Sequence, residues 1–275
     1  MHRNLVKGQK LSFYIVAWVD MLAQSELLEE LAPPTNLEDA EQLKALKQKA
    51  AKSIQNVRRF REFARSMAKH LSRVELDRGK LAAIPPKRRR LYKRYKRIRV
   101  IHRCFADSVL LAIPLEKSDV FPPFLSIESM FQQIVILTLI MLFARTPIRG
   151  AISIGLCTSF EGGELYGRAV ARAHSLEAED ARYPRIIVDE DFVDYLKSWQ
   201  KAEVPEEQKK VNSGFLNLII QSLERDTDGK LILSYLGRKY PEPYKDKTQL
   251  KEVCDFISEQ IDVFTKQRKP RGAPR

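Results

Sequence analysis

The feature that constrains the fold most is a short apolar segment, residues 11–19 (LSFYIVAWV), which ends at Asp20. It is rich in aromatic and β-branched residues and is bounded by charge, so it predicts a buried strand rather than a helix. The chain is therefore expected to build its core around a sheet, with Asp20 at the end of the first strand.

The remaining patterns predict helices and strands in alternation. A short helix runs through Leu31, and a long amphipathic helix over about 37–72 follows, with Asn36 as its N-cap. Residues 98–104 and 108–115 predict a β-hairpin with Asp107 at or just past its tip. Further patterns predict helices over about 126–145, 167–181 and 189–199, strands over 150–156 and 186–188, and a turn at 162–163.

This order of elements contains the split β-α-β-β-α-β pattern of a ferredoxin-like α+β fold. We expect such a domain over residues 1–200 and a C-terminal α/β extension over 201–275. The extension predicts a short helix or strand over 215–223, a turn at 226–229, a strand over 231–236 and a helix over about 248–266.

Several classes of protein are not supported by the sequence. The three cysteines are far apart and form no CxxC pair, which favours a reduced, cytoplasmic protein. The most apolar run, residues 134–144, is shorter than the roughly 20 residues that span a bilayer, so we expect a buried helix and no transmembrane segment. The sequence contains no P-loop, Rossmann glycine fingerprint, HExxH or GxSxG motif. The four histidines form no cluster, which argues against a histidine metal site.

Positive charge is concentrated in two segments. Of the formal net charge of +13, residues 87–103 contribute ten basic side chains with no acid, and the last ten residues contribute five more. The run 87–103 also contains tyrosines, and this composition is typical of a nucleic-acid or phosphate contact. The alternative is a solvated, charged entry into the next strand, or a contact for an acidic partner. The candidate contact residues are Arg88, Arg89, Arg90, Lys93 and Arg94.

Asp20 and Asp107 are the candidate metal ligands. In a ferredoxin-like sheet, the end of the first strand and the tip of the central hairpin lie side by side. Two neighbouring carboxylates repel each other, and a Mg²⁺ or Mn²⁺ ion relieves that repulsion while binding phosphates. The alternative is that Asp20 caps the next helix and Asp107 favours a tight turn.

Four stretches of the chain carry a family resemblance: residues 13–21 (FYIVAWVDM), 105–109 (FADSV), 149–155 (RGAISIG) and 166–177 (YGRAVARAHSLE). In this order, over roughly residues 11–199, they resemble class III adenylate and guanylate cyclases. The resemblance implies a nucleoside triphosphate substrate and metal binding by Asp20 and Asp107. It also implies a homodimer, because cyclase-type sites form between two facing domains. The long helix offers additional surface for self-association.

The chain also departs from the family pattern. The usual Gly before the second aspartate is Ala106. The Gly-led helix ordinarily carries an Asn and, four residues later, an Arg that contact the ribose and the phosphates. Ala171 and Ser175 hold those two positions here. Losing an arginine that neutralises phosphoryl charge can cost about 10³ to 10⁵ in rate, so the ordinary mechanism does not carry over intact.

Three residues of the same helix are candidates to replace the missing groups. Arg172 is the candidate catalytic residue, and Arg168 and His174 are candidates for substrate binding. Two functions stay open at this point. One is a divalent-metal-dependent cyclase that yields a cyclic nucleotide and pyrophosphate. The other is a non-catalytic module that binds a nucleotide, or nucleic acid through the basic run.

Overall fold

The computed structural model describes residues 11–22, 24–29, 31–32, 39–71, 86, 100–115, 123–160, 163–201, 206–235 and 255. The predicted features at residues 1–10, 33–38, 87–99, 161–162 and 236–275 lie outside these ranges, apart from Asp255. The described helices are α1 (Gln24–Glu29), α2 (Ala40–Leu71), α5 (Phe124–Phe143), α6 (Arg168–Glu179), α7 (Glu190–Ser198) and α8 (Glu206–Ile220). The strands are β1 (Leu11–Met21), β2 (Ile101–Phe105), β3 (Ser108–Leu115), β4 (Ile148–Ser159), β5 (Leu165–Gly167), β6 (Ile186–Val188), β7 (Leu223–Arg225) and β8 (Leu231–Leu233).

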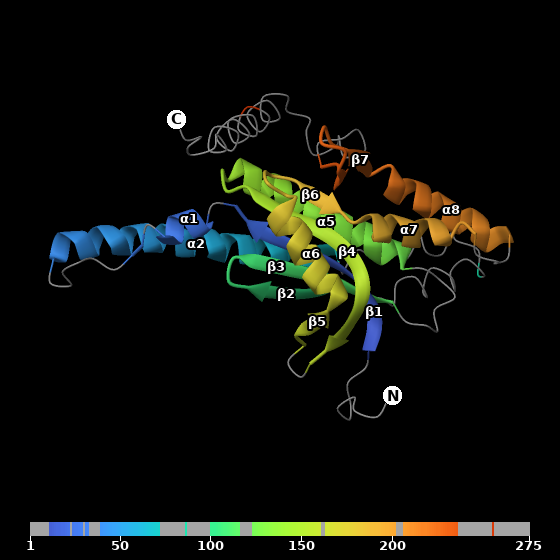
Figure 1. The fold of residues 1–275 in the computed structure, drawn as a ribbon, viewed down its shortest axis with the longest axis horizontal. Coiled ribbons are helices and arrows are strands. Elements are labelled where there is room, and N and C mark those ends of the chain that lie inside the picture. Colours follow the sequence, from blue (N-terminus) through green and yellow to red (C-terminus); the bar gives the residue numbers. More distant parts are fainter. Residues whose placement is uncertain are drawn as a thin grey trace, which may run out of the picture.

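One mixed sheet of eight strands organises the molecule. Its order is β2-β3-β1-β4-β6-β8-β7, and β5 pairs with the far end of β4. β4 lies at the middle of this order, and its neighbour β1 is antiparallel to both β3 and β4. β6 is parallel to β4 (Figure 1). The hairpin expected from the sequence forms as β2 and β3, and Ala106 and Asp107 make its two-residue turn. The described part of the extension continues the same sheet, since β8 pairs with β6.

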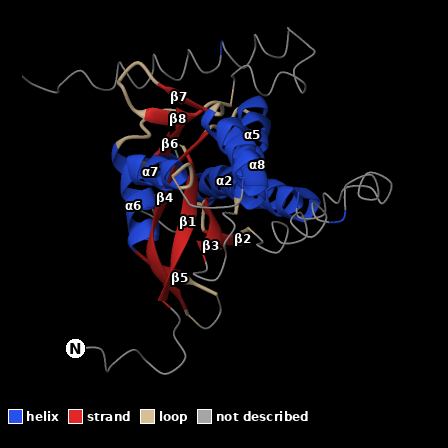
Figure 2. Ribbon diagram, turned by 90° about the vertical axis from the view of Figure 1, so that its right-hand side faces the viewer, coloured by secondary structure: helices blue, strands red, loops and turns tan. Residues whose placement is uncertain are grey.

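The two faces of the sheet are covered unequally. Helices α2, α5 and α8 lie on one side and α6 on the other (Figure 2). The larger core fills the first side, where α7 also contacts α5 through Phe192 and Phe131. On β1 the side chains alternate as a strand requires. Ile15 and Val19 join the larger core, whereas Tyr14 and Val16 face α6 and join a smaller core.

Helix α2 begins later than the sequence predicts. It starts at Ala40, and the Asp39 carboxylate accepts hydrogen bonds from the N–H groups of Glu41 and Gln42 at 3.1 and 3.0 Å. Both Asn36 and Asp39 are suitable N-cap residues, and the acid nearer to the apolar pattern satisfies the free N–H groups. Phe60 and Ala64 are buried on one side of α2. The Arg61 guanidinium donates a hydrogen bond to the carbonyl of Cys104 on β2.

Helix α5 is buried, as expected. Among the described helices it alone is long and apolar enough to cross a bilayer, and 67% of its most apolar window is buried inside the fold. It is packed by α2, α8 and the sheet, so its apolar surface is accounted for by the core.

The segment near residues 215–223 is helical up to Ile220, and Leu223 already begins β7. Its helical residues form the C-terminal part of α8, where Leu216 and Ile219 enter the larger core. Apolar residues three apart lie on the same side of a helix, and this spacing matches the buried pair.

Candidate functional site

The structure brings Asp20 and Asp107 together at one end of the sheet. Asp20, near the end of β1, is paired in register with Ser108 of β3 and with Arg149 of β4. Asp107 directly precedes Ser108, and its carbonyl accepts a hydrogen bond from the N–H of Met21 at 3.3 Å. The two aspartates come from segments far apart in sequence, and the antiparallel pairing of β1 and β3 fixes them side by side.

The carboxylate of Asp20 is electrostatically unfavourable in the folded chain. Burial, the neighbouring charge of Asp107 and, more weakly, that of Glu177 raise its pKa to about 6. A hydrogen bond from the Ser108 hydroxyl to Asp20 Oδ1, 2.9 Å long, only partly offsets these effects. A carboxylate destabilised by burial and by a like charge is the usual condition of a metal ligand in the absence of its cation.

The nearest basic residue in register does not neutralise Asp20. Arg149 of β4 forms an ion pair with Glu177 of α6, whose side chain is only 3% exposed. Burial raises the pKa of Glu177, and the Arg149 guanidinium opposes that rise. Because Glu177 holds Arg149, no basic residue in the described part of the chain pairs with either aspartate. The ion pair of Arg149 and Glu177 was not predicted from the sequence, because its members lie on different elements.

An aromatic group lies next to the carboxylates. Trp18, two residues before Asp20 on the same face, stacks on Phe105 with ring centroids 5.8 Å apart. The exposed ring of His174 on α6 meets Trp18 edge-on at 5.3 Å. His174 therefore lies near the Asp20 end of the sheet.

The two arginines proposed for α6 are engaged elsewhere. Arg168 pairs with Asp191 at 2.8 Å, and both side chains are about half exposed or more. Arg172 Nε lies 3.4 Å from Asp189, a buried carboxylate that also accepts a 2.7 Å hydrogen bond from Ser153. Both guanidinium groups thus contact acids that begin α7. Ser175, at the position of the missing arginine, donates to Glu179 on its own helix.

Two backbone positions shape the elements that carry these residues. Gly167 leads into α6 with φ of +149°, and a Cβ there would lie 2.3 Å from the Leu156 carbonyl oxygen, so only glycine fits. Ala106, in the turn before Asp107, has φ of +36°, in the left-handed region that alanine rarely adopts. The turn that carries Asp107 is therefore held in a strained conformation.

Only the end of the basic run is described. Arg103 of β2 donates from Nε to the Gly163 carbonyl at 2.8 Å, so it ties the hairpin to the loop before β5. Arg88, Arg89, Arg90, Lys93 and Arg94 lie outside the described residues.

A second group of acids, near the β7–β8 turn, provides a contrast. Asp226 and Asp228 each lie 2.7 Å from Arg185, which is almost fully buried on the segment before β6. Burial alone would raise the pKa of Asp226, but hydrogen bonds from Tyr183 and Arg185 hold it below its ordinary value. The Arg185 hydrogen bond likewise lowers the pKa of Asp228. This group is neutralised from within the chain.

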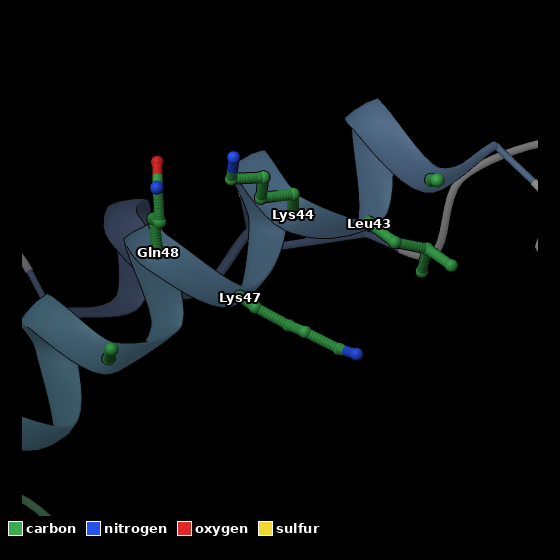
Figure 3. A pocket seen from close by; sticks show the side chains of 6 residues that line it. Leu43, Lys44, Lys47 and Gln48 are labelled. Atoms are coloured by element: carbon green, nitrogen blue, oxygen red, sulfur yellow. The ribbon is translucent and has the colours of Figure 1, made fainter.

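A shallow hollow on the surface lies away from the carboxylates. It is lined by the first turns of α2, including Leu43, Lys44, Lys47 and Gln48 (Figure 3), together with Ala40 and Ala51. None of these residues belongs to β1, β3 or α6, so this hollow is not part of the Asp20 site.

The donor set at the aspartates suits a hard divalent cation. Asp20 and Asp107 offer carboxylate oxygens, which Mg²⁺ and Mn²⁺ prefer. Within the described ranges, no group of three or more His, Cys, Asp or Glu side chains is arranged to hold a metal ion. A cation at this pair would take its other ligands from water or phosphate, as Mg²⁺ commonly does.

No protein-family model matches the chain, and no curated protein matches it in sequence. Solved structures similar to it include two bacterial adenylyl cyclases. The adenylyl cyclase CyaB from P. aeruginosa has a TM-score of 0.42 and 14% identity, covering 69% of this chain and 83% of that one. A bacterial light-regulated adenylyl cyclase has a TM-score of 0.42 and 12% identity, covering 92% of this chain and 58% of that one. At this level of similarity, no residue role is carried over from either protein.

Proposed function

We propose that the protein binds a nucleoside triphosphate together with Mg²⁺ or Mn²⁺ at Asp20 and Asp107, as a divergent nucleotide cyclase. The observation that carries the proposal is the pair of adjacent carboxylates, which have no cationic partner among the described residues; the pKa of Asp20 is raised to about 6. The motif order along the sequence supports the same assignment. The strand order β2-β3-β1-β4 also fits the ferredoxin-like sheet of that family.

The proposed reaction is an internal phosphoryl transfer. The ribose 3′-oxygen attacks the α-phosphorus, the bond from that phosphorus to the bridging oxygen breaks, and pyrophosphate leaves while the hydroxyl proton passes to water. A bound divalent cation would supply charge neutralisation at the phosphates. Asp20 and Asp107 would hold it, and the Ser108 hydroxyl keeps the Asp20 carboxylate in position.

His174 and the two arginines of α6 are the proposed substrate-side groups. His174 already faces Trp18 on the Asp20 side. Arg172 and Arg168 would have to leave Asp189 and Asp191 to reach a phosphate. For Arg168 such a change costs little, because both side chains of its ion pair are exposed, and exposed pairs contribute only about 0 to 1 kcal/mol. Arg172 is 46% exposed but would leave the buried Asp189, which keeps its hydrogen bond from Ser153.

The test is incubation of the purified protein with each of the four NTPs and Mn²⁺, followed by mass spectrometry for cyclic products. We expect one cyclic nucleotide with the wild-type chain and none with Asp20→Asn or Asp107→Asn. Calorimetry of Mn²⁺-nucleotide binding accompanies the assay. Unchanged affinity in both variants would exclude the metal site.

The same measurements separate the cyclase from the non-catalytic alternative. Binding that depends on Asp20 and Asp107 without any cyclic product would indicate a nucleotide-binding module that has lost turnover. The replacement of Asn and Arg by Ala171 and Ser175 is the feature that makes this outcome worth testing.

We also propose a two-fold homodimer. Five large apolar side chains of β1, β4, β5 and the β4–β5 loop are exposed: Leu11, Phe13, Leu156, Phe160 and Tyr166. Phe13 and Leu156 are paired in register on neighbouring strands, so they form a continuous apolar surface. We expect a dimer mass by light scattering at micromolar concentration. A monomer mass, unchanged by nucleotide, would contradict the proposal.

A further inference from the structure

Helix α2 is a strongly basic element that the charge analysis of the sequence did not single out. Its 32 residues include nine Lys and Arg side chains against two acids, a net charge of +7. The sequence pattern indicated that positive charge is concentrated in the run 87–103 and the C-terminal tail. Helix α2 is a third basic segment. Over all remaining residues the positive and negative formal charges nearly cancel, and this sum conceals the basic helix.

Four of these basic side chains form a stripe on the solvent side of α2. Lys44, Lys47, Arg58 and Arg65 are separated by three, eleven and seven residues, close to one, three and two turns of 3.6 residues. All four are exposed, and none forms an ion pair with another residue of the described chain. The opposite side of α2 carries Phe60 and Ala64, which are buried in the core.

The stripe is long, straight and accessible. From Lys44 to Arg65 it covers about 32 Å at 1.5 Å per residue. The N-terminal half of α2 extends beyond the edge of the sheet (Figure 1). Lys44 and Lys47 both extend away from the helix, in different directions in the view of Figure 3. Four like charges on one side of a helix repel one another, and a polyanion relieves that repulsion.

We propose that this stripe, Lys44, Lys47, Arg58 and Arg65, binds the phosphate backbone of double-stranded nucleic acid without sequence selection. A rod of this length exceeds the roughly 12 Å width of a major groove, so it can contact phosphates of both strands. The stripe contains no aromatic side chain, whereas binding of single strands ordinarily relies on aromatic stacking. A membrane-surface helix needs apolar anchors beside its basic residues. Ile54 is the one large apolar side chain of α2 that is strongly exposed among the described residues.

The experiment measures anisotropy of a labelled 30-base-pair duplex with the full chain at increasing salt. The variant carries Lys44→Gln, Lys47→Gln, Arg58→Gln and Arg65→Gln, since glutamine preserves helix propensity. The matched control removes four exposed charges elsewhere, with Arg182→Gln, Lys201→Gln, Lys209→Gln and Lys210→Gln. Two double variants, Lys44→Gln with Lys47→Gln and Arg58→Gln with Arg65→Gln, replace the quadruple variant if it does not fold.

We expect the stripe variant to lose tenfold or more in affinity and to flatten the slope of log K against log salt by about 3, because each neutralised duplex phosphate contributes about 0.9. Each double variant should give about half of that change, and the control should stay within about twofold of the wild-type chain. Equal losses in the stripe variant and the control would overturn the proposal. The proposal would also be overturned if duplex affinity fell only on replacing Arg88, Arg89, Arg90, Lys93 and Arg94. Binding to phosphatidylserine vesicles without binding to the duplex would overturn it as well.

Discussion

Two pairs of aspartates in this chain have opposite electrostatic surroundings. Asp226 and Asp228 surround Arg185, and their pKa values are lowered. Asp20 and Asp107 have no basic partner within the ranges that the structure describes, and the pKa of Asp20 is raised to about 6. The residue type is the same in both pairs, so the difference lies in whether the chain supplies the cation.

The comparison separates a structural role from a binding role. A buried arginine that also donates to the Asp180 carbonyl holds the β7–β8 turn against the segment before β6. At the other pair, Glu177 engages Arg149, the arginine in register with Asp20. The unfavourable interaction left there is available as binding energy for a cation from solution.

The largest expected effect comes from breaking the neutralised pair. Arg185→Met should lower the free energy of unfolding by about 3 kcal/mol, because it leaves the largely buried Asp226 and the half-exposed Asp228 without their cation. Denaturant unfolding of the variant measures this loss. Asp228→Asn is the control: its side chain is 45% exposed, and Asp226 keeps its contact with Arg185, so a much smaller loss is expected.

An Asp→Asn substitution at the other pair should instead raise the free energy of unfolding. The folded-state pKa of Asp20, about 6, lies above the ordinary 3.8, so the stability that comes from a protonated Asp20 is lost as the pH rises from about 4 through 6. Asp20→Asn removes this penalty. In EDTA it should raise the free energy of unfolding by up to about 3 kcal/mol at pH 8 and by less at pH 5. A destabilised variant at pH 8 would show that Asp20 is satisfied within the chain.

A third substitution, at Glu177, should give Asp20 a basic partner from within the chain. Glu177→Gln releases Arg149, which is in register with Asp20 and can then pair with it. We expect Mn²⁺-nucleotide affinity, measured by calorimetry, to fall about tenfold, equivalent to about 1.4 kcal/mol. Combining Glu177→Gln with Arg149→Gln should restore binding, because the competing cation is then absent. If the double variant binds as poorly as the single one, Glu177 acts by another route.

The smallest effect is expected at an exposed ion pair. Arg168→Gln breaks the contact with Asp191, in which the two side chains are 61% and 49% exposed. Solvent screens such a pair, so the free energy of unfolding should change by less than about 1 kcal/mol. A loss comparable to that of Arg185→Met would mean that exposure does not decide which of these ion pairs stabilises the fold.

Local patterns were sufficient to predict the elements that carry the aspartates. An apolar run rich in aromatic and β-branched residues predicted β1, and residues 98–104 and 108–115 predicted the β2–β3 hairpin. The strand over 186–188 has the same bounds in the structure. The predicted start of α2 was wrong because two good N-cap residues, Asn36 and Asp39, compete within one turn. Pairing of β8 with β6 could not be predicted from strands of three residues, which carry too little alternation to set a register.

Contacts between distant elements explain what the sequence did not reveal about the site. Arg149 and Glu177 meet only because α6 packs on β4, and neither residue stands out by its neighbours in the chain. The roles of Arg168 and Arg172 were inferred from one helix alone. Their acidic partners, Asp191 and Asp189, lie at the start of α7, which no periodicity within α6 could indicate.

The left-handed turn residue before Asp107 affects how that carboxylate meets a ligand. Holding Ala106 at φ of +36° costs about 1 kcal/mol that a glycine would not. Alanine also has fewer backbone conformations than glycine, so the turn has less freedom to lose. The entropy of ordering this turn is therefore spent when the chain folds, and an arriving cation or phosphate finds the Asp107 backbone already fixed.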